Sequence, residues 1–384
     1  MMRMDSCRIC YACDEGAAEH CRFMCGSEDE PSTTAVTRRS LLLGGAAASV
    51  GWFGPATRLQ ALAQSETSDA APVIDVHHHV SPPAFISALL KHQLGERPML
   101  DWTPSRSIED MDRAGVAVSI TSITTPGVWF GDREEARRLA RECNDYGAKL
   151  RTDFPGRFGL FASLPLPHVD DSLKEIEYAL DELKADGVGI MTSFGDKWLG
   201  DESFIPVMEE LNRRGAILYT HPTVANCCRN VLPDVHYSVV ELSTDTTRAI
   251  ANLVFSGTAN RFPKIRYIFS HAGGTMPFIY QRLTAYPVLD QKLGLKKDIQ
   301  AKVPGGVLNA LRSFYYDTAQ ASHPMAMQPL AKLVSAKQIL FGTDFPFRTT
   351  ADQIKGLSGC GFSPQELTAI YRGNAYQLMP QFSR

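Results

Sequence analysis

Histidine and aspartate side chains in this 384-residue chain fall at the ends of strand-like segments. The first is the apolar run 72–80, which contains His77 and His79 two positions apart. Successive side chains of a strand alternate between its two faces, so these two imidazoles share one face. Neutral imidazoles at this spacing can bind one ion without bending the backbone. The pair supplies only two ligands, and histidine clusters also occur on loops, so the rest of the chain must supply more.

Segments rich in β-branched and apolar residues alternate with segments of helical periodicity along the chain after residue 71. Strands that alternate with helices are parallel and joined by right-handed crossovers. Eight of them, over roughly the 250 residues typical of the fold, predict a single α/β domain, a (β/α)8 TIM barrel at 72–384. The alternative, an open doubly wound sheet, would need a G-x-G-x-x-G turn that is missing after the early strands. The expected strands are 72–80, 116–124, 157–163, 187–193, 216–221, 265–271, 313–317 and 338–344.

The C-terminal ends of barrel strands converge on one mouth of the barrel. His77 and His79 belong to the first strand, His221 ends the fifth, His271 ends the sixth and Asp344 ends the eighth. We therefore expect these five side chains to meet at the mouth. The other histidines are expected in a leader, on the outer face of the first strand, on helices or in loops, as surface or hydrogen-bonding residues. They are His20, His78, His92, His168, His236 and His323.

The overall composition is that of a globular protein with a large core. Hydrophobic residues make up 44% of the chain, and the formal net charge is −3. Because neither sign of charge is in excess, the sequence gives no reason to expect nucleic-acid binding.

The N-terminal segment has the pattern of an export signal. Arg38 and Arg39 directly precede the apolar run 41–53, and an A-x-A sequence follows at 61–63. This pattern is typical of a twin-arginine signal. We expect cleavage after Ala63 and export of the folded protein to the periplasm by the twin-arginine machinery. The alternative is a membrane anchor that is never cut, which the short, alanine-rich run disfavours.

Residues 1–63 are therefore expected to be a cleaved leader. Five of the nine cysteines lie in it, and their C-x2-C-x2-C spacing resembles part of an iron–sulfur or zinc site. Because they precede a signal that should be removed, we interpret them as leader sequence or as lying upstream of the true start. They are Cys7, Cys10, Cys13, Cys21 and Cys25.

Four motifs resemble the signature of the amidohydrolase superfamily, a family of metal-dependent hydrolase-type barrels. They are D-x-H-x-H at 75–79, T-H-P at 220–222, S-H-A-G-G at 270–274 and G-T-D-F-P-F at 342–347. The resemblance runs from about residue 73 to 379. It is strongest to the branch that contains aminocarboxymuconate-semialdehyde decarboxylase and the salicylate- and resorcylate-type decarboxylases.

The resemblance implies one divalent metal held by His77, His79, His221 and Asp344, and a catalytic role for His271 beside Asp344. Three imidazoles and one carboxylate suit zinc, with manganese as the alternative, and leave a position open for water or substrate. Many amidohydrolases use two metals bridged by a carboxylated lysine on the fourth strand. The segment 187–193 contains no lysine, so we predict a single metal.

Such a site can serve two reactions. In hydrolysis, metal-bound hydroxide attacks a carbonyl while Asp344 takes a proton; in non-oxidative decarboxylation, Asp344 and His271 protonate the substrate. Trp129, Phe130, Phe194, Phe345 and Phe347 follow strand ends and are expected to line a pocket for a flat aromatic acid, although some such rings pack helices onto strands. Together with the resemblance to 6-methylsalicylate decarboxylase-type proteins, this favours decarboxylation. A lactonase-type hydrolase and an inactive metal-binding, ligand-binding protein are the alternatives.

The resemblance also implies an arginine eleven residues beyond the catalytic histidine, which binds the substrate carboxylate, in some members across a dimer interface. This position is Arg282, and we expect a homodimer. An arginine on a helix is more often a solvated surface group. Arg97 and Arg106 are weaker candidates.

Overall fold

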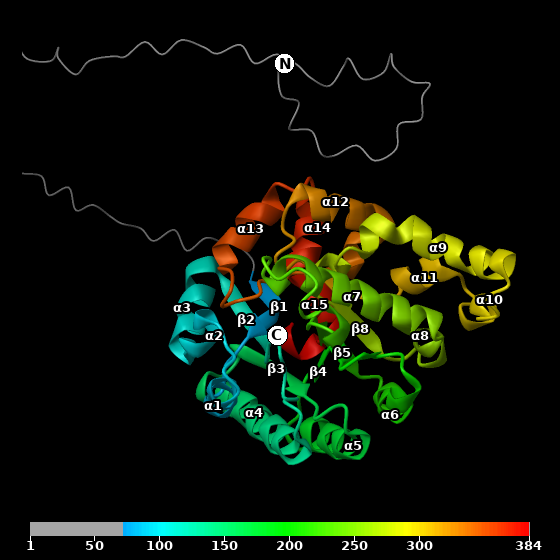
Figure 1. Cartoon of the computed structure of the whole chain (residues 1–384). Coiled ribbons are helices and arrows are strands. Elements are labelled where there is room, and N and C mark those ends of the chain that lie inside the picture. Colours follow the sequence, from blue (N-terminus) through cyan, green and yellow to red (C-terminus); the bar gives the residue numbers. More distant parts are fainter. Residues whose placement is uncertain (1–71, 384) are drawn as a thin grey trace, which may run out of the picture. The chain divides into compact units, whose positions relative to one another are not determined.

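The protein is described here by a computed structural model that covers residues 72–383 (Figure 1). All of these residues belong to one compact unit. The twin-arginine sequence, the expected cleavage after Ala63 and the five leader cysteines lie outside the described residues, so they stay predictions. In the described part of the chain, no helix is both long and apolar enough to span a membrane.

Eight parallel strands form the centre of the domain, in the order β1-β2-β3-β4-β7-β8-β9-β10. Hydrogen bonds from Val76 N to Phe341 O (2.9 Å) and from His79 N to Phe345 O (2.8 Å) join β1 to the segment after β10 and close the sheet. This confirms the predicted (β/α)8 barrel. The strands are β1 (Val73–His79), β2 (Val116–Ser122), β3 (Phe158–Ser163), β4 (Gly187–Met191), β7 (Ile217–His221), β8 (Arg266–Phe269), β9 (Tyr315–Asp317) and β10 (Ile339–Leu340). A small antiparallel hairpin, β5 (Ser193–Phe194) and β6 (Lys197–Trp198), follows β4.

Helices surround the strands, as Figure 1 shows. The longer ones are α1 (Pro83–Lys91), α3 (Pro104–Ala114), α4 (Arg133–Asp153), α5 (Val169–Glu177), α6 (Ile205–Arg214), α7 (Tyr237–Phe255), α9 (Met276–Leu293), α12 (Pro324–Leu333) and α13 (Thr350–Ser358). Short helices are α2 (Arg97–Leu100), α8 (Thr258–Arg261), α10 (Ile299–Lys302), α11 (Val307–Arg312), α14 (Pro364–Thr368) and α15 (Asn374–Leu378). Gly115 and Gly215 end α3 and α6 in the left-handed conformation, which costs glycine little, and the next strand follows directly.

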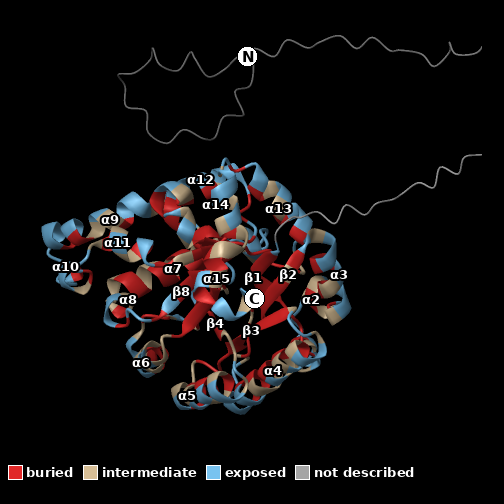
Figure 2. Ribbon diagram, turned by 180° about the vertical axis from the view of Figure 1, so that it is seen from behind, coloured by how far each residue is buried: buried red, intermediate tan, exposed pale blue. Residues whose placement is uncertain are grey.

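The strands are buried on both faces, and the outer faces of the helices are exposed (Figure 2). All seven residues of β1 are buried. Parallel strands covered on both faces read as nearly continuous apolar runs, which explains why the strand segments were recognisable in the sequence.

The C-terminal helices pack against the barrel. Ala375 and Leu378 of α15 join a buried cluster with Ile74 of β1. Arg266, the first residue of β8, donates a hydrogen bond from Nη1 to Leu378 O (3.0 Å). Because these contacts involve strand beginnings, α15 covers the end of the barrel opposite the strand ends that carry the site residues.

The eighth strand, β10, ends at Leu340 and is shorter than the expected 338–344. After Leu340 the chain turns toward the end of β1. Asp344 has a φ of +63°, and its backbone N donates to His77 O (2.9 Å). A Cβ on Gly342 would lie 2.8 Å from His77 Cβ and 3.0 Å from Asp317 Cβ. A glycine is therefore required here for the chain to approach β1 closely and to place Asp344 at the barrel mouth.

Candidate metal centre and active site

Three histidines and one aspartate meet at the barrel mouth. His77 and His79 end β1, His221 ends β7 and Asp344 follows β10, and all four are buried. One potential ligand atom from each lies within 4.8 Å of the others. The structure thus brings together the four residues that the sequence predicted.

The unpaired atoms of this cluster fit a cation. Nε2 of His77 and Nε2 of His79 face each other at 3.0 Å, and Asp344 Oδ1 lies 3.3 Å and 3.1 Å from them. Asp344 Oδ1 is buried and has no hydrogen-bond partner. Buried polar atoms are normally satisfied, and a divalent cation between these lone pairs would satisfy all of them at once.

The other ring nitrogen of each histidine contacts an acceptor that sets its tautomer. Nδ1 of His77 lies 2.8 Å from Asp317 Oδ2, and Nδ1 of His221 lies 2.9 Å from Pro222 O. Nδ1 of His79 is 3.4 Å from the backbone oxygen of Ser122. Because a carboxylate or carbonyl accepts, each Nδ1 carries a hydrogen, and the neutral form of each ring keeps an Nε2 lone pair for a metal.

Asp317 was not predicted as a site residue. Besides contacting His77, its Oδ1 accepts hydrogen bonds from the backbone N of His271 (2.9 Å) and of Ala319 (3.0 Å). It therefore orients a metal ligand and the turn that carries His271. Its position at the end of the seventh strand was the available signal, because the other site residues also follow strand ends.

Asp75, the first residue of the D-x-H-x-H motif, lies outside the ligand set. Its carboxylate accepts from His77 N (3.0 Å) and from Thr343 N (3.1 Å) and Oγ1 (2.6 Å). It also contacts His78 Nδ1 at 3.0 Å. Asp75 thus ties the end of β1 to the turn that precedes Asp344, which keeps ligands from the first and eighth strands in register.

Burial and charge act in opposite directions on the titration of these groups. Burial lowers the pKa of His77, but the carboxylates of Asp317 and Asp344 outweigh it and raise the pKa from 6.5 to about 10. Burial lowers the pKa of His221 well below 6.5. For Asp344 burial raises the pKa, but charged His77 and hydrogen bonds from the histidines bring it well below 3.8. Carboxylates thus attract positive charge to the His77 position, where a proton and a metal cation compete.

His271 lies beside the ligand set. Its Nε2 is 3.3 Å from Asp344 Oδ2, and the residue is buried. The turn that carries it is left-handed, with φ of +54° at His271 and +67° at Gly274. A Cβ on Gly274 would lie 1.9 Å from Ser243 O, so only glycine allows this turn to pack against α7. The position suits a proton donor or acceptor that works with Asp344.

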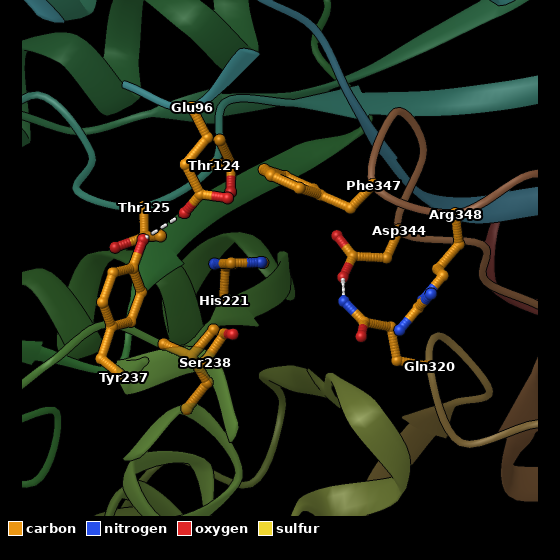
Figure 3. Close-up of a pocket in the computed structure, with 11 residues that line it drawn as sticks. Glu96, Thr124, Thr125, His221, Tyr237, Ser238, Gln320, Asp344, Phe347 and Arg348 are labelled. Atoms are coloured by element: carbon orange, nitrogen blue, oxygen red, sulfur yellow. Dashed lines mark hydrogen bonds between the residues drawn. The ribbon is translucent and has the colours of Figure 1, made fainter. Parts of the chain in front are cut away.

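A cavity of about 220 Å³ opens above the metal ligands (Figure 3). An adjoining cavity of about 340 Å³ reaches His271 and shares part of the wall. The first cavity is lined by Glu96, Thr124, Thr125, His221, Tyr237, Ser238, Leu242, Gln320, Asp344, Phe347 and Arg348. Of these, Gln320 donates a hydrogen bond from Nε2 to Asp344 Oδ2.

Of the five aromatic rings expected in the pocket, Phe347 lines the cavity, Phe130 stacks on His92, and the other three pack elsewhere. Phe345 stacks on His78 at 4.7 Å, Phe194 meets Phe204 edge-on at 5.8 Å, and Trp129 contacts His168 at 4.9 Å. None of the three lines the cavity of Figure 3. Their side chains fill the space between strand ends and helices, which is the other role such rings have.

Phe347 and Tyr237 are the phenylalanine and tyrosine that line this cavity. Arg282 is exposed on α9 and does not line it. A role for Arg282 across a dimer interface, and the homodimer itself, stay predictions, since the structure describes one chain.

Comparison with known proteins identifies the family. A sequence profile described as "Amidohydrolase" matches residues 74–380. The chain belongs to this amidohydrolase family. It is 36% identical over 282 residues to a 6-methylsalicylic acid decarboxylase of Penicillium expansum, covering 71% of this chain and 84% of the relative. It is 35% identical over 331 residues to 6-methylsalicylic acid decarboxylase AcuB of Aspergillus aculeatus, covering 81% and 97%.

A solved structure has the same fold. The dihydroxybenzoic acid decarboxylase of a Polaromonas species, with bound manganese and 2-nitroresorcinol, superposes with a TM-score of 0.70. It is 21% identical and covers 82% of this chain and 98% of its own. Family membership and the donor set together assign one divalent metal to His77, His79, His221 and Asp344.

Proposed function

We propose that the protein is a metal-dependent, non-oxidative decarboxylase of a hydroxylated aromatic acid of the 6-methylsalicylate type. The observation that carries the proposal is the contact between His271 Nε2 and Asp344 Oδ2, 3.3 Å, at the edge of the ligand set. This pair is positioned to hold a proton beside a substrate in the cavity. The identity of 35–36% with 6-methylsalicylic acid decarboxylases supports that reaction.

The chemistry requires protonation before carbon dioxide leaves. Direct loss of carbon dioxide would leave a high-energy aryl anion, whereas a ring carbon that is first protonated can release it readily. A metal bound at the site would supply positive charge for the carboxylate and the neighbouring hydroxyl of the substrate. His271 and Asp344 hold the proton and deliver it to the ring carbon. The bond to the carboxylate then breaks, and its electron pair restores the aromatic ring.

The dimensions of the site suit a small substrate. Ligand sites usually have volumes of roughly 300–1,000 Å³. The cavity of about 220 Å³ is smaller than this range, and its neighbour of about 340 Å³ is near the lower end of it. This supports a single-ring acid such as 6-methylsalicylate.

A panel of substrates tests the reaction. Hydroxybenzoates such as 6-methylsalicylate should release carbon dioxide without oxygen, nicotinamide or pyridoxal cofactor. In deuterium oxide, the product 3-methylphenol should carry one solvent deuterium at the vacated ring carbon, between the hydroxyl and methyl positions. If the panel releases no carbon dioxide while lactones or amides are turned over with incorporation of solvent oxygen, the protein is a hydrolase and the proposal is wrong.

The N-terminal sequence supports a second proposal, on location. The twin arginines Arg38 and Arg39 before an apolar run are typical of a protein exported in folded form to the periplasm. We expect N-terminal sequencing of periplasmic material to begin at Gln64. Recovery of the full-length leader on the mature protein would contradict this proposal.

A further inference from the structure

We propose that Arg348 binds the carboxylate of the substrate and thereby determines how the ring is oriented over the metal ligands. This inference rests on the proposed function, because it concerns an aromatic acid as the substrate. It assigns the carboxylate-binding role to an arginine of the chain that supplies the metal ligands. The family resemblance instead implied Arg282, in some members across a dimer interface.

Arg348 is held next to a metal ligand by a tight turn. The backbone N atoms of Phe347 and Arg348 donate to Asp344 O at 2.9 Å and 3.2 Å. Asp344 is in turn attached to β1 through its own N and His77 O. The backbone of Arg348 is thus fixed relative to a metal ligand, while its side chain is exposed and lines the cavity.

The guanidinium is also available for a ligand. Among the described residues that line the two adjoining cavities, Arg348 is the single lysine or arginine, and it lines both. In residues 72–383, the ion pairs of Asp344 are with histidines and do not involve Arg348. Gln320, which donates to Asp344 Oδ2, lies on the same side of the cavity as Arg348 (Figure 3). A carboxylate in the cavity would therefore meet a cation that has no competing ion pair in this part of the chain.

The other arginines predicted for this role lie outside both cavities. Arg97 pairs with Asp101 at 3.5 Å, and Arg106 donates to Asp101 O at 2.8 Å. Arg282 is exposed on α9. None of the three lines either cavity. Among the lysines and arginines of residues 72–383, this leaves Arg348 as the one that lines both cavities and can pair with an acid there.

The opposite wall of the cavity repels a carboxylate. Glu96 lines it and accepts a hydrogen bond from the hydroxyl of Tyr237 at 2.7 Å. Burial and this hydrogen bond raise the pKa of Tyr237, so its hydroxyl remains a donor. Figure 3 shows Glu96 and Tyr237 on one side of the cavity and Arg348 on the other. The charges of Glu96 and Arg348 thus favour one orientation, with the carboxylate of the substrate toward Arg348.

Ligand binding to matched variants tests the proposal. Metal-loaded protein carrying His271→Ala, which slows turnover, is titrated calorimetrically with 6-methylsalicylate and with 3-methylphenol. Adding Arg348→Gln should weaken binding of the acid about 10- to 100-fold, the usual effect of losing charge-assisted hydrogen bonds. Binding of 3-methylphenol, which has no carboxylate, should be unchanged. Arg348→Lys should bind the acid with intermediate affinity, because it keeps the charge but loses the paired donors.

A control separates this role from a general effect of net charge. Lys355 is exposed on α13 and lines neither cavity, so Lys355→Gln removes one positive charge elsewhere and should bind both ligands normally. With His271 intact, Arg348→Gln should raise KM more than it lowers kcat. An equal loss of affinity for acid and phenol, or no loss at all, would overturn the assignment. If protein with Arg348 intact binds no hydroxybenzoate, the proposed function fails, and the assignment fails with it.

Discussion

Replacing His77, His79, His221 or Asp344 with alanine is expected to remove the bound metal and the activity together. Each residue supplies one of the four ligand atoms that lie within 4.8 Å of one another, so each substitution leaves the donor set incomplete. A metal contributes several kcal/mol of charge stabilisation, so the rate should fall by about 10³-fold or more. Elemental analysis alongside activity measurement checks both losses.

Two further variants make the metal experiment quantitative. Asp317→Asn keeps all four ligands but weakens the acceptor on His77 Nδ1, and metal affinity should fall about 10- to 100-fold. His92→Ala changes a histidine outside the ligand set, which contacts Glu135 and Phe130. This variant should retain the metal. Native protein should contain one zinc or manganese per chain. Two metals per chain, or full activity with none, would contradict the single-metal site.

Replacing His271 with alanine is expected to cut the rate by about 10²- to 10⁴-fold, the contribution of a positioned acid–base group. Metal content should stay near normal, because His271 contacts Asp344 Oδ2 at 3.3 Å and lies outside the ligand set. The measurement is kcat together with elemental analysis on the same preparation. Loss of metal in parallel with activity would make His271 a ligand, and an unchanged rate would remove it from the mechanism.

The positions of the metal ligands could be predicted because they depend on local rules. Alternation along a strand places His77 and His79 on one face, and parallel strands bring their C-terminal ends to one mouth. His221 follows from its place at the end of a strand, whereas Asp344 is placed by the turn after β10, and the choice of these four ligands came from the family resemblance. The barrel itself was recognisable from strands buried on both faces, which read as apolar runs between helical segments.

The pocket wall could be predicted only in part, because it depends on the path of the loops. Phe345 and Phe347 are two residues apart, yet Phe345 stacks on His78 while Phe347 faces the cavity, because the chain turns at Asp344 with a positive φ. Arg348 reaches the cavity through the same turn.

Contacts between distant segments decide the remaining features of the site. Asp317 meets His77 across 240 positions of sequence, and Glu96 meets Tyr237 across 141. Neither pair has a local periodicity that would indicate it. Strand spacing therefore specifies which atoms can bind the metal, whereas the folded loops specify which charges surround the substrate, because side-chain direction beyond a strand end depends on long-range packing.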